Sequence, residues 1–214
     1  MLMTSAPNTA AARAGTAPGR WIGAGWNIVA GDLGNFVLMT LIALVLTLAA
    51  GVTVVGILVV AGPFTAGLFV AVRRRMQEGR SDLMDVFQGF NRFVDTLLLG
   101  LLVSVFSLIG LAFCVIPFFV VGAFYLFAFP FQIDRNLSFW EAMRASRRVT
   151  AEELAGYVAF FLILCMLNLV GLMLAGVGLL ITIPVSIAAI AAAYQDVVGF
   201  QPQPQQTAGP IIIP

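Results

Sequence analysis

Arginine clusters are the strongest chemical signal in this chain. An arginine side chain near a membrane surface can bind a lipid phosphate through two parallel hydrogen bonds. The sequence therefore predicts contact with lipid head groups, anionic ones included, at Arg73, Arg74, Arg75, Arg144, Arg147 and Arg148. All eleven basic residues are arginine. A GC-rich genome would produce the same bias, so the choice of arginine over lysine is weak evidence by itself.

Residues for catalysis are scarce. The sequence has no histidine, which removes the usual imidazole base and any His-bearing metal site. Cys114 and Cys165 lie inside apolar runs and predict neither a disulfide nor a metal site. Two acidic pairs fall where helices are predicted to begin, where a carboxylate stabilises the helix dipole. These pairs are Asp82 with Asp85 and Glu152 with Glu153. We expect no catalytic, cofactor-binding or metal-binding residues, no cofactor and no enzymatic activity.

The composition is that of an integral membrane protein. Of the 214 residues, 61% are hydrophobic and only 10% are charged, and the mean hydropathy is +1.03. Soluble domains carry about 25% charged residues. The net charge of +1 argues against bulk electrostatic attraction to nucleic acid, which normally requires a strongly basic face.

The charged residues divide the chain into three apolar stretches. None occurs between Asp32 and Arg73, between Asp95 and Asp134, or between Glu153 and Asp196. Each gap is about 40 residues, enough for two spans of about 20 residues. The sequence predicts an all-α membrane protein with about six transmembrane helices, arranged as three hairpin repeats broken by Pro or Gly.

Each hairpin has two possible turn positions. They are Ala50-Gly51 or Gly62-Pro63, Gly110 or Ile116-Pro117, and Gly176 to Gly178 or Ile183-Pro184. Proline is favoured at the start of a helix and disfavours helix in the residue before it. The prolines are therefore slightly preferred as turns; otherwise each proline would kink the second helix of its hairpin.

Short amphipathic helices are predicted on the membrane surface. At 20–31, two tryptophans precede the first apolar stretch, and Ile22, Trp26 and Val29 share one side. A short interfacial helix and a continuous extension of the first span fit this pattern equally well. At 81–94, Ser81 is the predicted N-cap. The predicted apolar stripe there is Leu83, Phe87, Phe90 and Val94.

Two further helix starts are predicted from capping boxes, in which a Ser or Thr and a Glu three residues later satisfy backbone amides. Ser138 with Glu141 begins one amphipathic helix, and Thr150 with Glu153 begins the fifth span. The first of these helices should place Phe139, Ala142, Met143 and Ser146 on one side. Glu141, Arg144 and Arg148 should lie on the other, at a spacing that allows ion pairs.

Small and kinked positions predict how the helices pack. Small residues at a spacing of three or four let membrane helices approach closely, and a polar side chain within a span can hydrogen-bond to a neighbour. The predicted packing positions are Gly62, Pro63, Pro117, Asn168, Gly171, Ala175, Gly178 and Pro184. Asn168, the most polar side chain well inside a span, is interpreted as an interhelical contact in preference to a transport residue.

The arginines also predict the topology. They occur in the connections between hairpins and not at the hairpin tips, so the positive-inside rule places these connections and both termini in the cytoplasm. The location is then a bacterial cytoplasmic (inner) membrane. The predicted parts are a flexible tail over 1–19 without a signal peptide, a transmembrane bundle over 20–200, and a Pro/Gln-rich tail over 201–214.

These motifs resemble a known group of proteins. The segments GPFTAGL at 62–68, SDLMDVFQGFNRF at 81–93 and SFWEAMRAS at 138–146, with an Ile-Pro turn and Asp134 between them, carry the resemblance. They are similar to uncharacterised bacterial six-helix membrane proteins related to the membrane domain found beside some glycerophosphoryl diester phosphodiesterases. The resemblance covers roughly 19–199. The phosphodiesterase domain itself is absent, so the resemblance implies the fold and no such activity.

The expected function is that of a non-enzymatic scaffold or accessory subunit. Its predicted partners are membrane lipids and other membrane proteins or copies of itself, with no nucleic acid. The alternative is an uncoupled pathway for a lipid or small solute. Its polar lining would come from Asn168, Ser104, Ser107 and Thr182. Coupled transport is not expected, because no ionisable group is predicted at membrane depth.

Overall fold

The computed structural model describes residues 15–50, 54–112, 115–174 and 176–201. Most of both predicted tails and the predicted packing residue Ala175 lie outside these ranges. The described part is helical and contains no strand. The main helices are α1 (Pro18–Ala30), α2 (Leu33–Ala50), α3 (Val54–Glu78), α4 (Phe93–Ala112), α5 (Val115–Phe124), α6 (Ala128–Arg135), α7 (Phe139–Thr150), α8 (Leu154–Met173) and α9 (Leu179–Val197). Two 3₁₀ helices, η2 (Leu83–Arg92) and η3 (Ala151–Glu153), precede α4 and α8.

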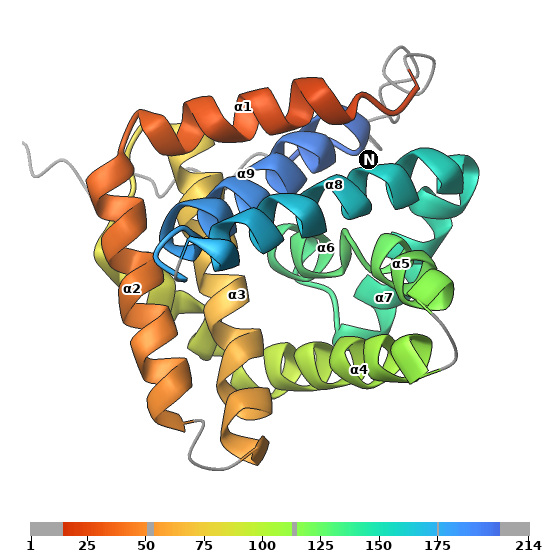
Figure 1. The fold of residues 1–214 in the computed structure, drawn as a ribbon, viewed down its shortest axis with the longest axis horizontal. Helices are drawn as coiled ribbons and strands as arrows, with labels where there is room; N and C mark the ends of the chain where they lie inside the picture. Colours follow the sequence, from red (N-terminus) through yellow and green to blue (C-terminus); the bar gives the residue numbers. More distant parts are fainter. Residues whose placement is uncertain (1–14, 51–53, 113–114, 175, 202–214) are drawn as a thin grey trace, which may run out of the picture.

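The described helices include four segments long and apolar enough to cross a membrane. They are Leu83–Ser107, Pro117–Arg135, Phe139–Met173 and Leu179–Val197. α1 and α2 pass the same test as a pair but meet at a bend of 95°. Figure 1 shows α8 and α9 running across the view while α2 and α3 run down it. The fold is therefore the predicted all-α membrane type, whereas six spans in three repeats remain a prediction.

The preference for turns at the prolines was wrong for the first and third hairpins. Pro63 lies inside α3 and Pro184 inside α9. Pro117 lies in the first turn of α5, where helical N–H groups have no intrahelical partner and proline costs little. The last break instead contains Gly176, whose positive φ of 77° suits glycine. Neighbouring helices can compensate for the hydrogen bond that an internal proline removes from an apolar helix.

α1 is a separate helix that packs along α9, as Figure 1 shows. The sharp bend before α2 rules out a continuous extension of the first span. The buried residues of α1 are Trp21, Gly25 and Val29. The buried side is therefore rotated relative to the predicted one, and Trp26 is 50% exposed. A Cβ on Gly25 would lie 2.6 Å from the backbone nitrogen of Ala189. The shift thus follows from the close approach that Gly25 permits.

The predicted stripe at 81–94 was wrong in part, although Leu83 and Phe90 do pack against the core. The buried residues are Asp85, Val86 and Gly89, while Phe87 and Val94 are exposed. A Cβ on Gly89 would collide with the Pro63 carbonyl of α3. The segment adopts a 3₁₀ helix, which has three residues per turn, so an α-helical spacing does not describe its faces.

The first turn of η2 differs from the prediction in its cap. Asp82 is the N-cap: its carboxylate accepts from the Met84 N–H at 3.0 Å, and the Asp82 N–H donates to Asp85. Ser81, the predicted N-cap, donates to the Asp32 carboxylate at 2.7 Å instead. Ser81 thereby joins this segment to the start of α2.

The capping box of α7 is confirmed. The Ser138 hydroxyl accepts from the Glu141 N–H, and the Ser138 N–H donates to the Glu141 carboxylate at 3.1 Å. The inner face is Ala142, Met143, Ser146 and Thr150. The second box is wrong, because the buried Thr150 hydroxyl donates within α7 and toward Phe124. Glu153 instead accepts from the Thr16 N–H at 2.8 Å.

Small residues bring the apolar helices together as predicted. Asn168 on α8 donates to the Ser186 hydroxyl on α9 at 2.8 Å. A Cβ on Gly171 would lie 3.1 Å from Gly178, across the same contact. Gly62 approaches the Gly100 Cα in the α3–α4 contact, where a Cβ would lie 3.4 Å away. These positions therefore act in helix packing.

Candidate functional site

A buried ion pair joins α3 to α6. The Arg73 guanidinium lies 2.9 Å from the Asp134 carboxylate, and the Asp134 side chain is 0% exposed. Tyr194 of α9 donates its hydroxyl to the same carboxylate at 3.0 Å. The Gln201 N–H, just after α9, donates to it at 3.1 Å. Asp134 thus has partners in three separated parts of the chain.

Arg73 is enclosed by the same elements. Its guanidinium lies 5.7 Å from the Phe200 ring centroid, and its Nε atom is buried without a hydrogen-bond partner. The expected head-group contact is therefore wrong for Arg73, which pairs with Asp134 inside the fold. Burying a charge is tolerated only beside a group of opposite charge. For Arg73 that group is Asp134, at the end of α6.

A second pair connects α3 to η2. Arg74 donates to the buried Asp85 carboxylate at 2.8 Å, and Gln88 donates to the same oxygen at 2.6 Å. Arg74 also pairs with Glu78 at 3.2 Å. Hydrogen bonds from Arg74 and then from Arg80 hold the pKa of the Glu78 carboxyl below its usual value.

The remaining predicted arginines divide between the fold and the surface. Arg75 donates to the Gly31 carbonyl at 2.9 Å, near the bend between α1 and α2. Arg144, Arg147 and Arg148 are exposed on α7. The guanidinium of Arg144 lies 5.9 Å from the Trp140 ring centroid, and that of Arg147 lies 5.6 Å from the Phe124 ring centroid. Glu141, which caps α7, makes no ion pair with these arginines within the described residues. The α7 arginines remain open to a head group.

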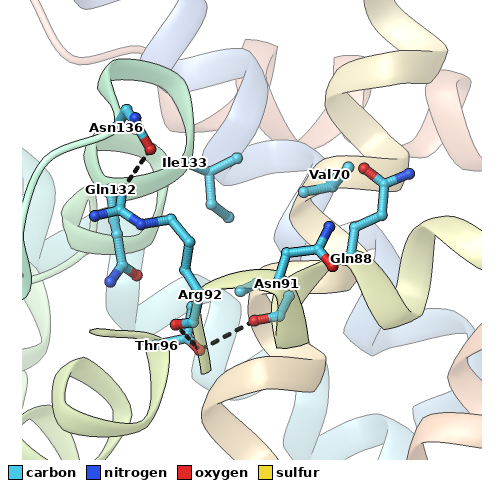
Figure 2. A pocket seen from close by; sticks show the side chains of 10 residues that line it. Val70, Gln88, Asn91, Arg92, Thr96, Gln132, Ile133 and Asn136 are labelled. Carbon is cyan, nitrogen blue, oxygen red and sulfur yellow. Dashed lines mark hydrogen bonds between the residues drawn. The ribbon is translucent and has the colours of Figure 1, made fainter. Parts of the chain in front are cut away.

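A small pocket lies between η2, α4 and α6. Its volume is about 140 Å³. Figure 2 shows its polar side chains, with Arg92 reaching Asn136 and the Thr96 hydroxyl donating to backbone carbonyls of η2. It is lined by Ala66, Val70, Gln88, Gly89, Asn91, Arg92, Thr96, Gln132, Ile133 and Asn136. Gln132 is 1% exposed, and neither polar atom of its amide has a hydrogen-bond partner.

Neither Asp134 nor Gln132 was predicted as a site residue. Both end an aromatic stretch, FAFPFQID, that is typical of the last turns of a span. A glutamine within such a stretch is the only signal that could have marked the pocket. The Asp134 partners are distant in sequence, so no local pattern indicates them.

The described part of the chain contains no group of three or more His, Cys, Asp or Glu residues that could hold a metal ion. Cys165 lies on α8 as a free, half-buried thiol. Cys114 lies outside the described residues. The chemistry that the arrangement offers is therefore hydrogen bonding and charge pairing.

Comparison with known proteins gives three similar mycobacterial sequences. The chain is 34% identical over 105 residues to uncharacterized protein Mb2590 of Mycobacterium bovis and to uncharacterized protein MT2637 of Mycobacterium tuberculosis. Uncharacterized protein Rv2560 of Mycobacterium tuberculosis matches at the same identity.

The matches are partial. They cover 49% of this chain and 32% of each relative, so the chain spans about a third of the length of these relatives. No family model and no solved structure matches. The resemblance to the membrane domain beside glycerophosphoryl diester phosphodiesterases stays a prediction.

Proposed function

We propose that this chain is a non-enzymatic integral protein of the bacterial cytoplasmic membrane that acts as a scaffold or accessory subunit. It would pack with other membrane proteins, copies of itself or lipid. The proposal includes six spans in three hairpins, with both termini in the cytoplasm. The absence of histidine from the sequence supports a non-enzymatic role.

The exposed apolar face of α8 is the observation that supports this function best. The face continues past the end of the helix toward α9. Its most exposed members on α8 are Met166, Val170, Leu172 and Met173, and Leu174 follows them. An uninterrupted apolar surface of this kind fits lipid tails or a partner helix. The ion pairs meanwhile join helix ends and connections, as in the contacts among α3, η2 and α6.

The test is co-purification in mild detergent followed by mass spectrometry, with a surface variant. Val170→Trp keeps the α8 face apolar but changes its shape, so we expect a protein partner to be lost. Val45→Trp on α2 is the matched control, because Val45 is the same residue type at 53% exposure against 57% for Val170. A protein that purifies without any stoichiometric membrane partner, and as a monomer, would contradict the scaffold role.

The alternative, an uncoupled pathway, rests on a smaller observation, the buried and unpartnered Asn168 Oδ1 and Thr182 Oγ1 atoms between α8 and α9. Asn168 uses its amide N–H groups within the α8–α9 contact, where Ser186 accepts one of them. Ser104 and Ser107 lie on α4, which packs against α3 and α5. The polar side chains of the expected lining thus belong to different helix contacts.

A further inference from the structure

The Gln132 amide is one of four buried side chains with unpartnered polar atoms in the described part of the fold, beside Arg73, Asn168 and Thr182. A buried primary amide normally donates through its nitrogen and accepts through its oxygen. Here both atoms are buried and unpartnered, while the residue lines the pocket between η2, α4 and α6. An orphaned buried polar group usually indicates a bound molecule or a functional role. The amide is suited to a group that both donates and accepts, and a hydroxyl does both.

The rest of the pocket lining adds a positive charge. Arg92 is the charged residue of the lining, and it is held in place by Asn136 and by Asp95 at 2.8 Å. Asn91 adds a further exposed amide beside it. No carboxylate lines the pocket, but Arg92 is paired with Asp95 at 2.8 Å, so an anionic oxygen in the pocket would share the guanidinium with that carboxylate. A pocket of about 140 Å³ holds a small group, well below the roughly 300 Å³ typical of drug-sized ligands.

We propose that this pocket binds a polyol phosphate, with the phosphate at Arg92 and a free hydroxyl at the Gln132 amide. The neighbouring Phe93 and Val94 side chains are exposed and apolar, which suits the acyl chains of a lipid that carries such a head group. This inference rests on the proposed membrane location. The same chemistry occurs in phosphatidylglycerol and in soluble glycerol phosphate.

The test uses Gln132→Leu, which removes both polar atoms and keeps a side chain of similar size. The full chain is reconstituted with equal amounts of phosphatidylglycerol and phosphatidylcholine, and retained lipids are counted by native mass spectrometry. We expect Gln132→Leu to lower the preference for phosphatidylglycerol about tenfold, as losing a hydrogen-bonded contact does. Gln77→Leu is the matched control, because Gln77 is exposed on α3 and outside the pocket.

Three comparisons make the outcome decisive. Phosphatidic acid lacks the glycerol hydroxyls, and equal retention of it would overturn the role of Gln132. Displacement of phosphatidylglycerol by glycerol 3-phosphate would identify the soluble ester as the ligand source. Asn91→Ala changes an exposed residue on the pocket rim and should also weaken retention of phosphatidylglycerol. This variant takes the place of Gln132→Leu if Gln132→Leu fails to fold.

Unchanged retention in both pocket variants would refute the proposal. Failure of the proposed membrane location would be seen separately, as protein that does not enter the vesicles at all.

Discussion

Asp134 shows how a single residue can hold together distant parts of a membrane protein. Its carboxylate pairs with Arg73 on α3 and accepts from Tyr194 on α9 and from the Gln201 backbone. Water cannot replace these partners, because the side chain is buried. Removing one partner of a buried ion pair leaves the other charge unpaired in a medium that solvates it poorly.

We predict that Asp134→Asn destabilises the fold by about 3–5 kcal/mol, the typical cost of breaking a buried pair. The measurement is thermal unfolding of the detergent-solubilised protein. Glu78→Gln is the control, because its carboxylate pairs with Arg74 and Arg80 at the surface, where ion pairs contribute little. Equal melting temperatures for the two variants would show that the Arg73–Asp134 pair does not stabilise the protein.

Residue roles were predictable where the signal was local. Asn168 is a polar side chain in an apolar helix, so an interhelical hydrogen bond was expected, and its bond to Ser186 confirms it. Arg73 was expected at the surface, because three consecutive arginines after a span are typical of an interface. Its burial depends on Asp134, 61 residues later, and no pattern within either segment indicates that pairing.

At the scale of elements, close helix contacts depend on individual glycines. α1 shows this most clearly, because two of its glycines have opposite environments. Gly25 faces the backbone of α9, whereas a Cβ on Gly23 would meet nothing within 4 Å. The two positions therefore separate the effect of packing from the effect of helix propensity.

We predict that Gly25→Ala loosens α1 from α9 and lowers stability by about 1–3 kcal/mol, as overpacking does. Gly23→Ala should be neutral or slightly stabilising, because alanine favours the helix. Thermal unfolding measures both, and the fluorescence of Trp21, which is buried in this contact, reports the local change. If Gly25→Ala and Gly23→Ala behaved alike, the close α1–α9 contact would be wrong.

Element types were easier to predict than element boundaries and faces. The lengths of the apolar stretches predicted the helices, and the Ser138 capping box predicted the start of α7. The turns were assigned to prolines because sequence alone does not show whether a neighbour compensates for a lost hydrogen bond. The buried side of η2 was missed because its close contact with α3 depends on Gly67 and Gly89.

At the scale of the whole molecule, composition predicted a helical membrane protein, and the count of six spans stays a prediction. The charge-free gaps predicted three hairpins. The described structure has four candidate spans, or five with the bent α1–α2 pair. A hydropathy profile reports the apolar content of a segment and not the direction of the chain. It therefore does not show the 95° bend between α1 and α2.

We predict that the charged connections face the cytoplasm and the α8–α9 connection faces the opposite side. Single cysteines at Gln77 and Glu152 should resist an impermeant thiol reagent in intact cells, while one at Val177 should react. All three positions are exposed, and the background would lack Cys114 and Cys165. Labelling after lysis confirms that each thiol is reactive. Reaction at Gln77 in intact cells would reverse the proposed orientation.

The connection between Asp134 and Gln201 also has a consequence for biosynthesis. Arg73 emerges from the ribosome long before Asp134, and the last donor, the Gln201 N–H, follows the final described helix. A chain that ends before α9 can form the Arg73–Asp134 ion pair but lacks the Tyr194 hydroxyl and the Gln201 N–H that complete the hydrogen bonding of the carboxylate. The end of α9 is therefore the point in synthesis at which the buried carboxylate acquires its full set of partners.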